Sequence, residues 1–96
     1  MRIYNDTTFK LSEHISWQKI NEIELSYVRN IKTKKFYIFK DTEFYIIKFI
    51  SEFENITSSE IIDKCSELYD IDKKIIEGDI IDFLADLEST GVVCVG

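Results

Sequence analysis

The chain has 96 residues, of which 45% are hydrophobic and 14% aromatic, and this length and apolar content fit one folded domain and exclude a disordered chain. Its formal net charge of −6 is unevenly divided: residues 1–40 hold eight Lys and Arg against four Asp and Glu (+4), and residues 41–96 hold four Lys against fourteen Asp and Glu (−10). No apolar run approaches the roughly 18–20 residues that span a bilayer, and no secretory signal is visible, so we expect a single cytoplasmic domain over residues 1–96 with no membrane partner. Such a division of charge, in a chain with one His and no Pro, favours a binding surface over a catalytic pocket.

The first part of the chain has the patterns of β-strands. Met1–Glu13 is polar and predicts either a loosely packed arm or a first edge strand. Ile15–Trp17 and Glu24–Val28 alternate apolar with polar residues, as half-buried strands do. Asn30–Lys34 is a polar, basic turn, and Lys35–Phe39 is a third strand rich in aromatic residues. The last two strands are therefore expected to form a hairpin with a loop of about three to five residues.

A first helix is predicted to begin after Asp41, whose side chain can cap it. Its apolar residues nearly encircle the helix, which must therefore be largely buried. These residues are Phe44, Ile46, Ile47, Phe49, Ile50 and Phe53.

Two further helices have clear end signals. Thr57–Glu60 has the capping-box pattern, and the second helix then places Ile61, Ile62, Cys65 and Leu68 on one face. Asp72 can cap the third helix, and Gly91 can end it in a left-handed conformation. The apolar face of the third helix follows helical spacing through Ile76, Ile80, Phe83, Leu84 and Leu87, and residues 92–95 form an extended apolar tail. The order predicts an α+β, winged-helix-like fold, in which a three-stranded antiparallel sheet is followed by three helices.

No set of residues suited to catalysis or metal binding is visible. His14 is the only imidazole and has no partner for a metal site or a nucleophile–base pair. Cys65 and Cys94 are far apart and outside any ligand spacing; a small buried Cys65 is favoured over a disulfide. Asp79, Asp82 and Asp86 are interpreted as the solvated side of the third helix. Trp17 is interpreted as a core anchor of the sheet, with a role as a binding aromatic as the alternative. We therefore expect no enzyme, no metal and no cofactor.

Charge argues against nucleic acid as a partner. A helix-turn-helix over 58–90 would need a basic second helix, but residues 72–90 hold Lys73 and Lys74 against six acidic residues. The only plausible nucleic-acid surface is the basic hairpin, for which a solvated turn is the simpler interpretation. Its basic residues are Arg29, Lys32, Lys34, Lys35 and Lys40.

Three segments together resemble the PqqD-like family. Residues 35–50 are similar to that family's stretch of aromatic and apolar residues around Asn-x-Thr-Gly, although Lys40 stands at the Asn position and Glu43 at the Gly position. Residues 57–61 resemble its Thr-x-x-Glu-Ile helix start, and residues 79–93 its closing helix with Phe-Leu and a final Gly. Trp17 stands where the family often has Trp, so that the resemblance covers roughly residues 15–93.

The resemblance implies a precursor-recognition domain for ribosomally made, post-translationally modified peptides. In the family the leader segment of the precursor lies as an added antiparallel strand beside the third strand, in the cleft against the third helix. Carried over, this places peptide binding on two sets of residues. They are Lys34, Lys35, Phe36, Tyr37, Ile38 and Phe39 on the strand side, and Ile76, Asp79, Ile80 and Phe83 on the helix side.

The expected partners are a precursor peptide and a peptide-modifying enzyme, with radical-SAM enzymes among the candidates. No CxxxCxxC is present, so iron–sulfur chemistry would belong to another chain or to a portion of the protein that this sequence does not include. Two alternatives remain open: a winged-helix regulator that binds DNA, and a general protein–protein adaptor. A basic recognition helix would favour the first, and a short peptide gene beside a maturase gene would favour leader binding over both.

Overall fold

The computed structural model describes residues 6–96 of the chain. Within them it has six strands, three α-helices and one short 3-10 helix, which confirms an α+β fold with an antiparallel sheet ahead of three helices. The elements are β1 (Thr8–Leu11), β2 (Ile15–Ile20), η1 (Asn21–Ile23), β3 (Leu25–Asn30), β4 (Phe36–Lys40), α1 (Thr42–Glu52), β5 (Ile56–Thr57), α2 (Ser58–Tyr69), α3 (Lys73–Ser89) and β6 (Val93–Val95).

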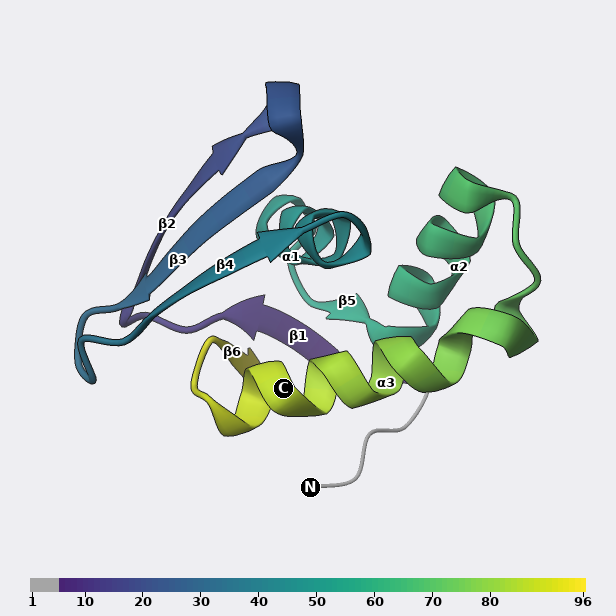
Figure 1. Ribbon diagram of the computed structural model, residues 1–96. Helices are drawn as coiled ribbons and strands as arrows, with labels where there is room; N and C mark the ends of the chain where they lie inside the picture. The colour runs from purple at the N-terminus through teal and green to yellow at the C-terminus, as the bar shows by residue number, and fades with distance from the viewer. Residues whose placement is uncertain (1–5) are drawn as a thin grey trace.

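The predicted strands form one antiparallel sheet in the order β2-β3-β4. The alternation over Ile15–Trp17 and Glu24–Val28 identified β2 and β3, although both strands run further than the pattern suggested. Lys35–Phe39 corresponds to β4, and β3 and β4 form the predicted hairpin. Figure 1 shows this sheet on one side of the molecule, with α1 beside β4 and α3 along the base.

A second sheet that the sequence did not predict joins β1 with β5 and β6, in the order β5-β1-β6. The expectation of an arm or edge strand over residues 1–13 is wrong for residues 8–11, because β1 is the middle strand. Phe9 pairs with Ile56 on one side and Val95 on the other, and its side chain is only 1% exposed. Residues 1–5, the start of the predicted arm, lie outside the described residues.

The end signals of α2 and α3 are confirmed. At the start of α2, the amide of Glu60 donates to the Thr57 hydroxyl and the amide of Thr57 donates to Glu60 Oε1, both at 3.1 Å. At the start of α3, Asp72 accepts from the amide of Lys74 at 2.9 Å. Gly91 has φ +79°, and the amides of residues 91 and 92 bond back to the carbonyls of residues 88 and 87, which is the Schellman pattern.

Two apolar side chains that were predicted to be buried are exposed. Phe53, at 43% exposure, follows the last residue of α1 with an extended backbone, so it leaves the helical stripe, and the Lys64 ammonium lies 4.2 Å from its ring centroid. Leu68, at 47%, lies in the last turn of α2, the end that stands clear of both sheets in Figure 1. A local apolar pattern cannot show where a helix extends past its neighbours.

The core forms around α1, which contacts β1, β3, β4 and α2. Phe44, Ile46, Ile47 and Ile50 are buried, as the helix pattern predicted. Cys65 is a buried free thiol in the same core, and burial raises its pKa to about 11, so it is a poor nucleophile at neutral pH. None of the helices in residues 6–96 has the length and apolar character that crossing a membrane requires.

Asp41 stands at the start of α1 but does not cap it, contrary to the sequence prediction. Its backbone has φ +56° and ψ −130°, and its side chain makes no capping hydrogen bond. A capping residue normally has an extended backbone that aims its oxygen at the first free amides, and the tight corner between β4 and α1 prevents this. The corner gives a residue with a side chain a positive φ outside the left-handed helical region, which is strained.

Replacing Asp41 with glycine should therefore raise the free energy of unfolding by about 1 kcal/mol, because relief of strain exceeds the added freedom of the unfolded chain. Urea denaturation would measure this. Asp70→Gly is a matched control: Asp70 has φ 53° and ψ 49°, a region that Asp tolerates, so a smaller change is expected there. A loss of stability in Asp41→Gly would show that the Asp41 side chain stabilises the corner.

Candidate functional site

The outer edge of β4 is open for pairing. β4 pairs with β3 on one side, and no strand within residues 6–96 pairs with its other side. The amide of Asn30 donates to the Lys35 carbonyl at 2.8 Å, and antiparallel pairs alternate, so Lys35, Tyr37 and Phe39 direct their main-chain groups toward β3. The amides and carbonyls in between therefore face the open edge; they belong to Phe36, Ile38 and Lys40.

A groove runs beside this edge, with β4 and the start of α1 on one side and α3 on the other. Its floor contains a contact between the two elements, in which the rings of Phe39 and Phe83 meet edge to face with centroids 5.4 Å apart. Tyr37 stacks on Phe39 with centroids 6.1 Å apart and thus extends the aromatic wall along β4. The strand side of the groove is therefore aromatic.

Two cavities lie in the groove, with volumes of about 240 and 200 Å³. Glu43 and Phe83 line both, so the cavities are neighbours. The first is lined by Thr42, Glu43, Ile46, Ile76, Asp79, Ile80 and Phe83. The second is lined by Tyr37, Phe39, Glu43, Phe83, Asp86, Leu87 and Thr90. Each has an apolar wall with a few polar groups, which suits apolar or amphipathic side chains of a ligand.

The charged groups of the groove are all acidic. Glu43, Asp79 and Asp86 line the cavities, and no Lys or Arg does. Partial burial raises the pKa of Glu43, the Asp41 carboxylate raises it further, and Lys40 lowers it. A ligand that buries an additional carboxylate beside Glu43 would be disfavoured by charge repulsion.

The structure divides the residues that the resemblance implied. Ile76, Asp79 and Ile80 line the first cavity and Tyr37 and Phe39 line the second, with Phe83 in both, and their role in binding remains a prediction. Phe36 and Ile38, which are 66% and 48% exposed, have side chains on the opposite face of β4, because side chains alternate along a strand. Phe36 and Ile38 can therefore contact a peptide at the open edge of β4 only through their main-chain groups.

Lys34 and Lys35 lie in and beside the β3–β4 loop rather than in the groove. Asn30 organises this loop, because its buried side chain accepts from the amides of Lys32 and Thr33 at 3.0 and 3.1 Å. Lys32, Lys34 and Lys35 are exposed in the loop that leads into β4, and Lys34 lines a hollow on the opposite face of the sheet from the groove.

Several groove residues were not predicted from the sequence. Asp86 and Thr90 follow Asp79 and Phe83 at helical spacing, so the stripe along α3 could have identified them. Glu43 had no such signal, because only the corner between β4 and α1 brings it to both cavities. The interpretation of Asp79 and Asp86 as ordinary solvated side chains was incomplete, since both are exposed and yet line the groove.

The remaining chemical candidates lie away from the groove. His14 is exposed next to β2, and Cys94 is an exposed residue of β6. Over residues 6–96, no three His, Cys, Asp or Glu side chains are grouped so that they could hold a metal ion. Trp17 is partly buried and packs against the core, as a sheet anchor does.

Comparison with known proteins agrees with this architecture. The family described as coenzyme PQQ synthesis protein D (PqqD) matches residues 28–93, from β3 into β6. A solved structure, "TbiB1 in Complex with the TbiA(beta) Leader Peptide", superposes with a TM-score of 0.78 and 20% sequence identity over 88% of this chain and 93% of that chain, which shows a shared fold. Among curated proteins no relative matches. Because the family match spans well over half of the sequence, the chain belongs to the PqqD family.

Proposed function

We propose that this chain binds the leader segment of a ribosomally made precursor peptide and presents it to a peptide-modifying enzyme. The observation that carries the proposal is the open edge of β4 beside a groove with two apolar-walled cavities. The leader adds to the sheet as an antiparallel strand next to β4, with alternate side chains directed into the groove against α3. The likeness to TbiB1, whose structure contains a leader peptide, supports leader binding.

The expected energetics require both the edge and the cavities. An added strand makes about four to six main-chain hydrogen bonds with β4, worth roughly 1 kcal/mol each. These bonds barely offset the roughly 2–5 kcal/mol that ordering a flexible peptide costs. A micromolar complex needs about −8 kcal/mol, and two apolar side chains buried in the cavities contribute about 1.5–3 kcal/mol each. Main-chain pairing therefore mainly sets the alignment of the leader along β4, and side chains buried in the cavities contribute most of the binding free energy.

In this proposal the chain is not an enzyme. The groove has carboxylates and threonine hydroxyls but no His, Cys, Lys or Arg in its lining, and the Thr90 hydroxyl donates to main-chain carbonyls of α3 rather than to a base. The chemistry belongs to the modifying enzyme, and the chain contributes recognition. Binding of DNA by α3 is disfavoured, because Lys73 is paired with Asp63 at 2.6 Å and the exposed side of the helix is acidic.

Hydrogen exchange followed by NMR tests the binding mode at single residues. On addition of a leader peptide, the amides of Ile38 and Lys40 should gain protection, because they face the open edge and acquire a partner. The amides of Tyr37 and Phe39 should be protected already in the free protein, because they bond to β3. Protection that appears only on α2 or on the outer edge of β2 would reject strand addition at β4.

The basic loop is expected to steer acidic residues of the leader. In an antiparallel complex the C-terminal part of the bound leader lies near Lys34 and Lys35, so acidic residues are expected there and not over Glu43. Lys34→Glu/Lys35→Glu should weaken leader binding about three- to tenfold at low salt, mainly through slower association, and the difference should shrink at high salt.

Lys10→Glu/Lys74→Glu makes the same change in net charge at exposed positions away from the groove and serves as the control. Leader affinity of both variants would be measured by isothermal titration at two salt concentrations. Equal affinities for the two double variants would show that the loop lysines have no special role.

A further inference from the structure

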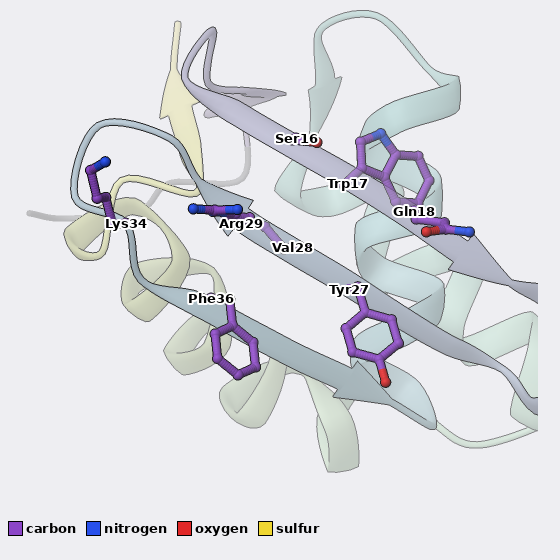
Figure 2. Close-up of a pocket in the computed structure, with 8 residues that line it drawn as sticks. All are labelled: Ser16, Trp17, Gln18, Tyr27, Val28, Arg29, Lys34 and Phe36. Atoms are coloured by element: carbon purple, nitrogen blue, oxygen red, sulfur yellow. The ribbon is translucent and has the colours of Figure 1, made fainter.

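The side of the β2-β3-β4 sheet that faces away from the helices is unusually apolar for an exposed surface. We define this outer face by Ser16, Gln18, Tyr27, Arg29, Lys34, Phe36 and Ile38. Tyr27, Phe36 and Ile38 are 45%, 66% and 48% exposed. Figure 2 shows Tyr27 and Phe36 standing out from β3 and β4 on the same side of the sheet, with the helices behind it.

The register of the sheet places these side chains in adjoining rows. Gln18, Tyr27 and Ile38 lie across the three strands in one row, and Ser16, Arg29 and Phe36 in the next row on the same face. All of these residues except Ile38 line a hollow of about 470 Å³, together with Lys34 from the loop and with Trp17 and Val28. The exposed face of an antiparallel sheet is normally polar, so neighbouring large apolar side chains here mark a surface that another molecule covers.

Charge indicates the chemistry of that molecule. The outer face has Arg29 and Lys34 and no Asp or Glu, although the whole chain has a net charge of −6. Apolar and aromatic side chains beside an Arg are typical of the energetic centre of a protein–protein interface. A complementary partner therefore presents apolar side chains surrounded by carboxylates.

Nucleic acid fits this face less well than a protein does. A nucleic-acid surface usually neutralises several phosphates, whereas only two cations, Arg29 and Lys34, line the hollow. Ile38 also offers no flat ring for a base to stack on.

We propose that the outer face is the docking surface for the peptide-modifying enzyme, through an apolar and acidic patch on that enzyme. This inference rests on the proposed function. Its structural basis is β4, which directs Tyr37 and Phe39 into the leader groove and Phe36 and Ile38 to the outer face. Leader and enzyme thus occupy opposite faces of β4 and do not compete for its side chains, although the loop residue Lys34 lies close enough to both to contact either, so the bound leader is held next to the enzyme.

Tyr27→Ser and Arg29→Glu test the docking surface, because neither residue lies in the leader groove. The controls are Ile75→Ser, which removes an apolar side chain that is 72% exposed on α3, and Lys74→Glu, which makes the same charge change as Arg29→Glu. The probes are a leader peptide and the purified enzyme that modifies the same precursor, with thermal unfolding measured to confirm that each variant is folded.

The proposal expects Tyr27→Ser and Arg29→Glu to bind the leader within twofold of wild type and the enzyme at least tenfold more weakly. It expects the controls to bind both like wild type. Enzyme affinity that is unchanged in both variants would overturn the proposal, and an equal loss of leader affinity would assign the outer face to the leader site instead.

Two further measurements exclude the other occupants. A wild-type dimer in sedimentation that Arg29→Glu disrupts would assign the outer face to a second copy of the chain. Tight binding of a 20-nucleotide single strand that Arg29→Glu abolishes would assign it to nucleic acid. Either result overturns the proposal. If wild-type protein binds the enzyme but no leader, the proposed leader function fails while the docking surface stands.

Discussion

Replacing Ile38 with proline should weaken the binding of a leader peptide about 10- to 100-fold while the domain remains folded. The amide of Ile38 faces the open edge of β4 and has no role in pairing with β3, so a proline there removes a donor only from the added strand. Its ring also occupies the place where the leader backbone would approach. The loss corresponds to about 1.4–2.8 kcal/mol of binding free energy, which isothermal titration would measure.

Two neighbouring variants make this test specific. Ile38→Val keeps the amide and should bind the leader like wild type. Tyr37→Pro removes an amide that bonds to β3 and should lower the free energy of unfolding by about 3 kcal/mol. If Ile38→Pro binds the leader with wild-type affinity, the leader does not pair with β4, and the groove binds it through side chains alone.

Replacing Phe9 with alanine should destabilise the domain by about 3–5 kcal/mol, a large fraction of the roughly 5–15 kcal/mol that small domains have. Phe9 is 1% exposed in the middle strand of the β5-β1-β6 sheet, where its loss leaves a cavity in the core. Urea denaturation would measure the change, and a marked fall in the thermal midpoint should accompany it.

Lys10→Ala is the matched control in the same strand, because Lys10 is exposed and surface substitutions usually change stability by less than about 0.5 kcal/mol. A small effect of Phe9→Ala would mean that β1 is only loosely attached, as the sequence pattern of residues 1–13 had suggested. The structure predicts a firmly attached β1, since this strand pairs with β5, which precedes α2, and with β6, which follows α3.

The sequence by itself determined the features that depend on near neighbours in the chain. Hydrophobic alternation located β2 and β3, aromatic and β-branched content located β4, and short-range capping chemistry located the starts of α2 and α3 and the end of α3 at Gly91. The order of the motifs over residues 35–93 identified the family, which the match over residues 28–93 confirms.

Other features were decided only by contacts between distant segments. The second sheet could not be predicted, because β1, β5 and β6 are two to four residues long and are strands only by virtue of one another. The conformation of Asp41 follows from the corner between β4 and α1, which overrides the capping preference of Asp. The same corner brings Glu43 into the groove.

The exposure of β4 on two different surfaces depends both on local sequence and on contacts between distant segments. Alternation along the sequence is enough to separate Tyr37 and Phe39 from Phe36 and Ile38, because successive side chains of a strand point to opposite faces. Only the placement of α3 decides which pair faces the groove and which pair is left exposed, since the apolar character of the two pairs is nearly the same. Local sequence therefore determined the strand, and tertiary packing determined which of its faces became the candidate peptide site.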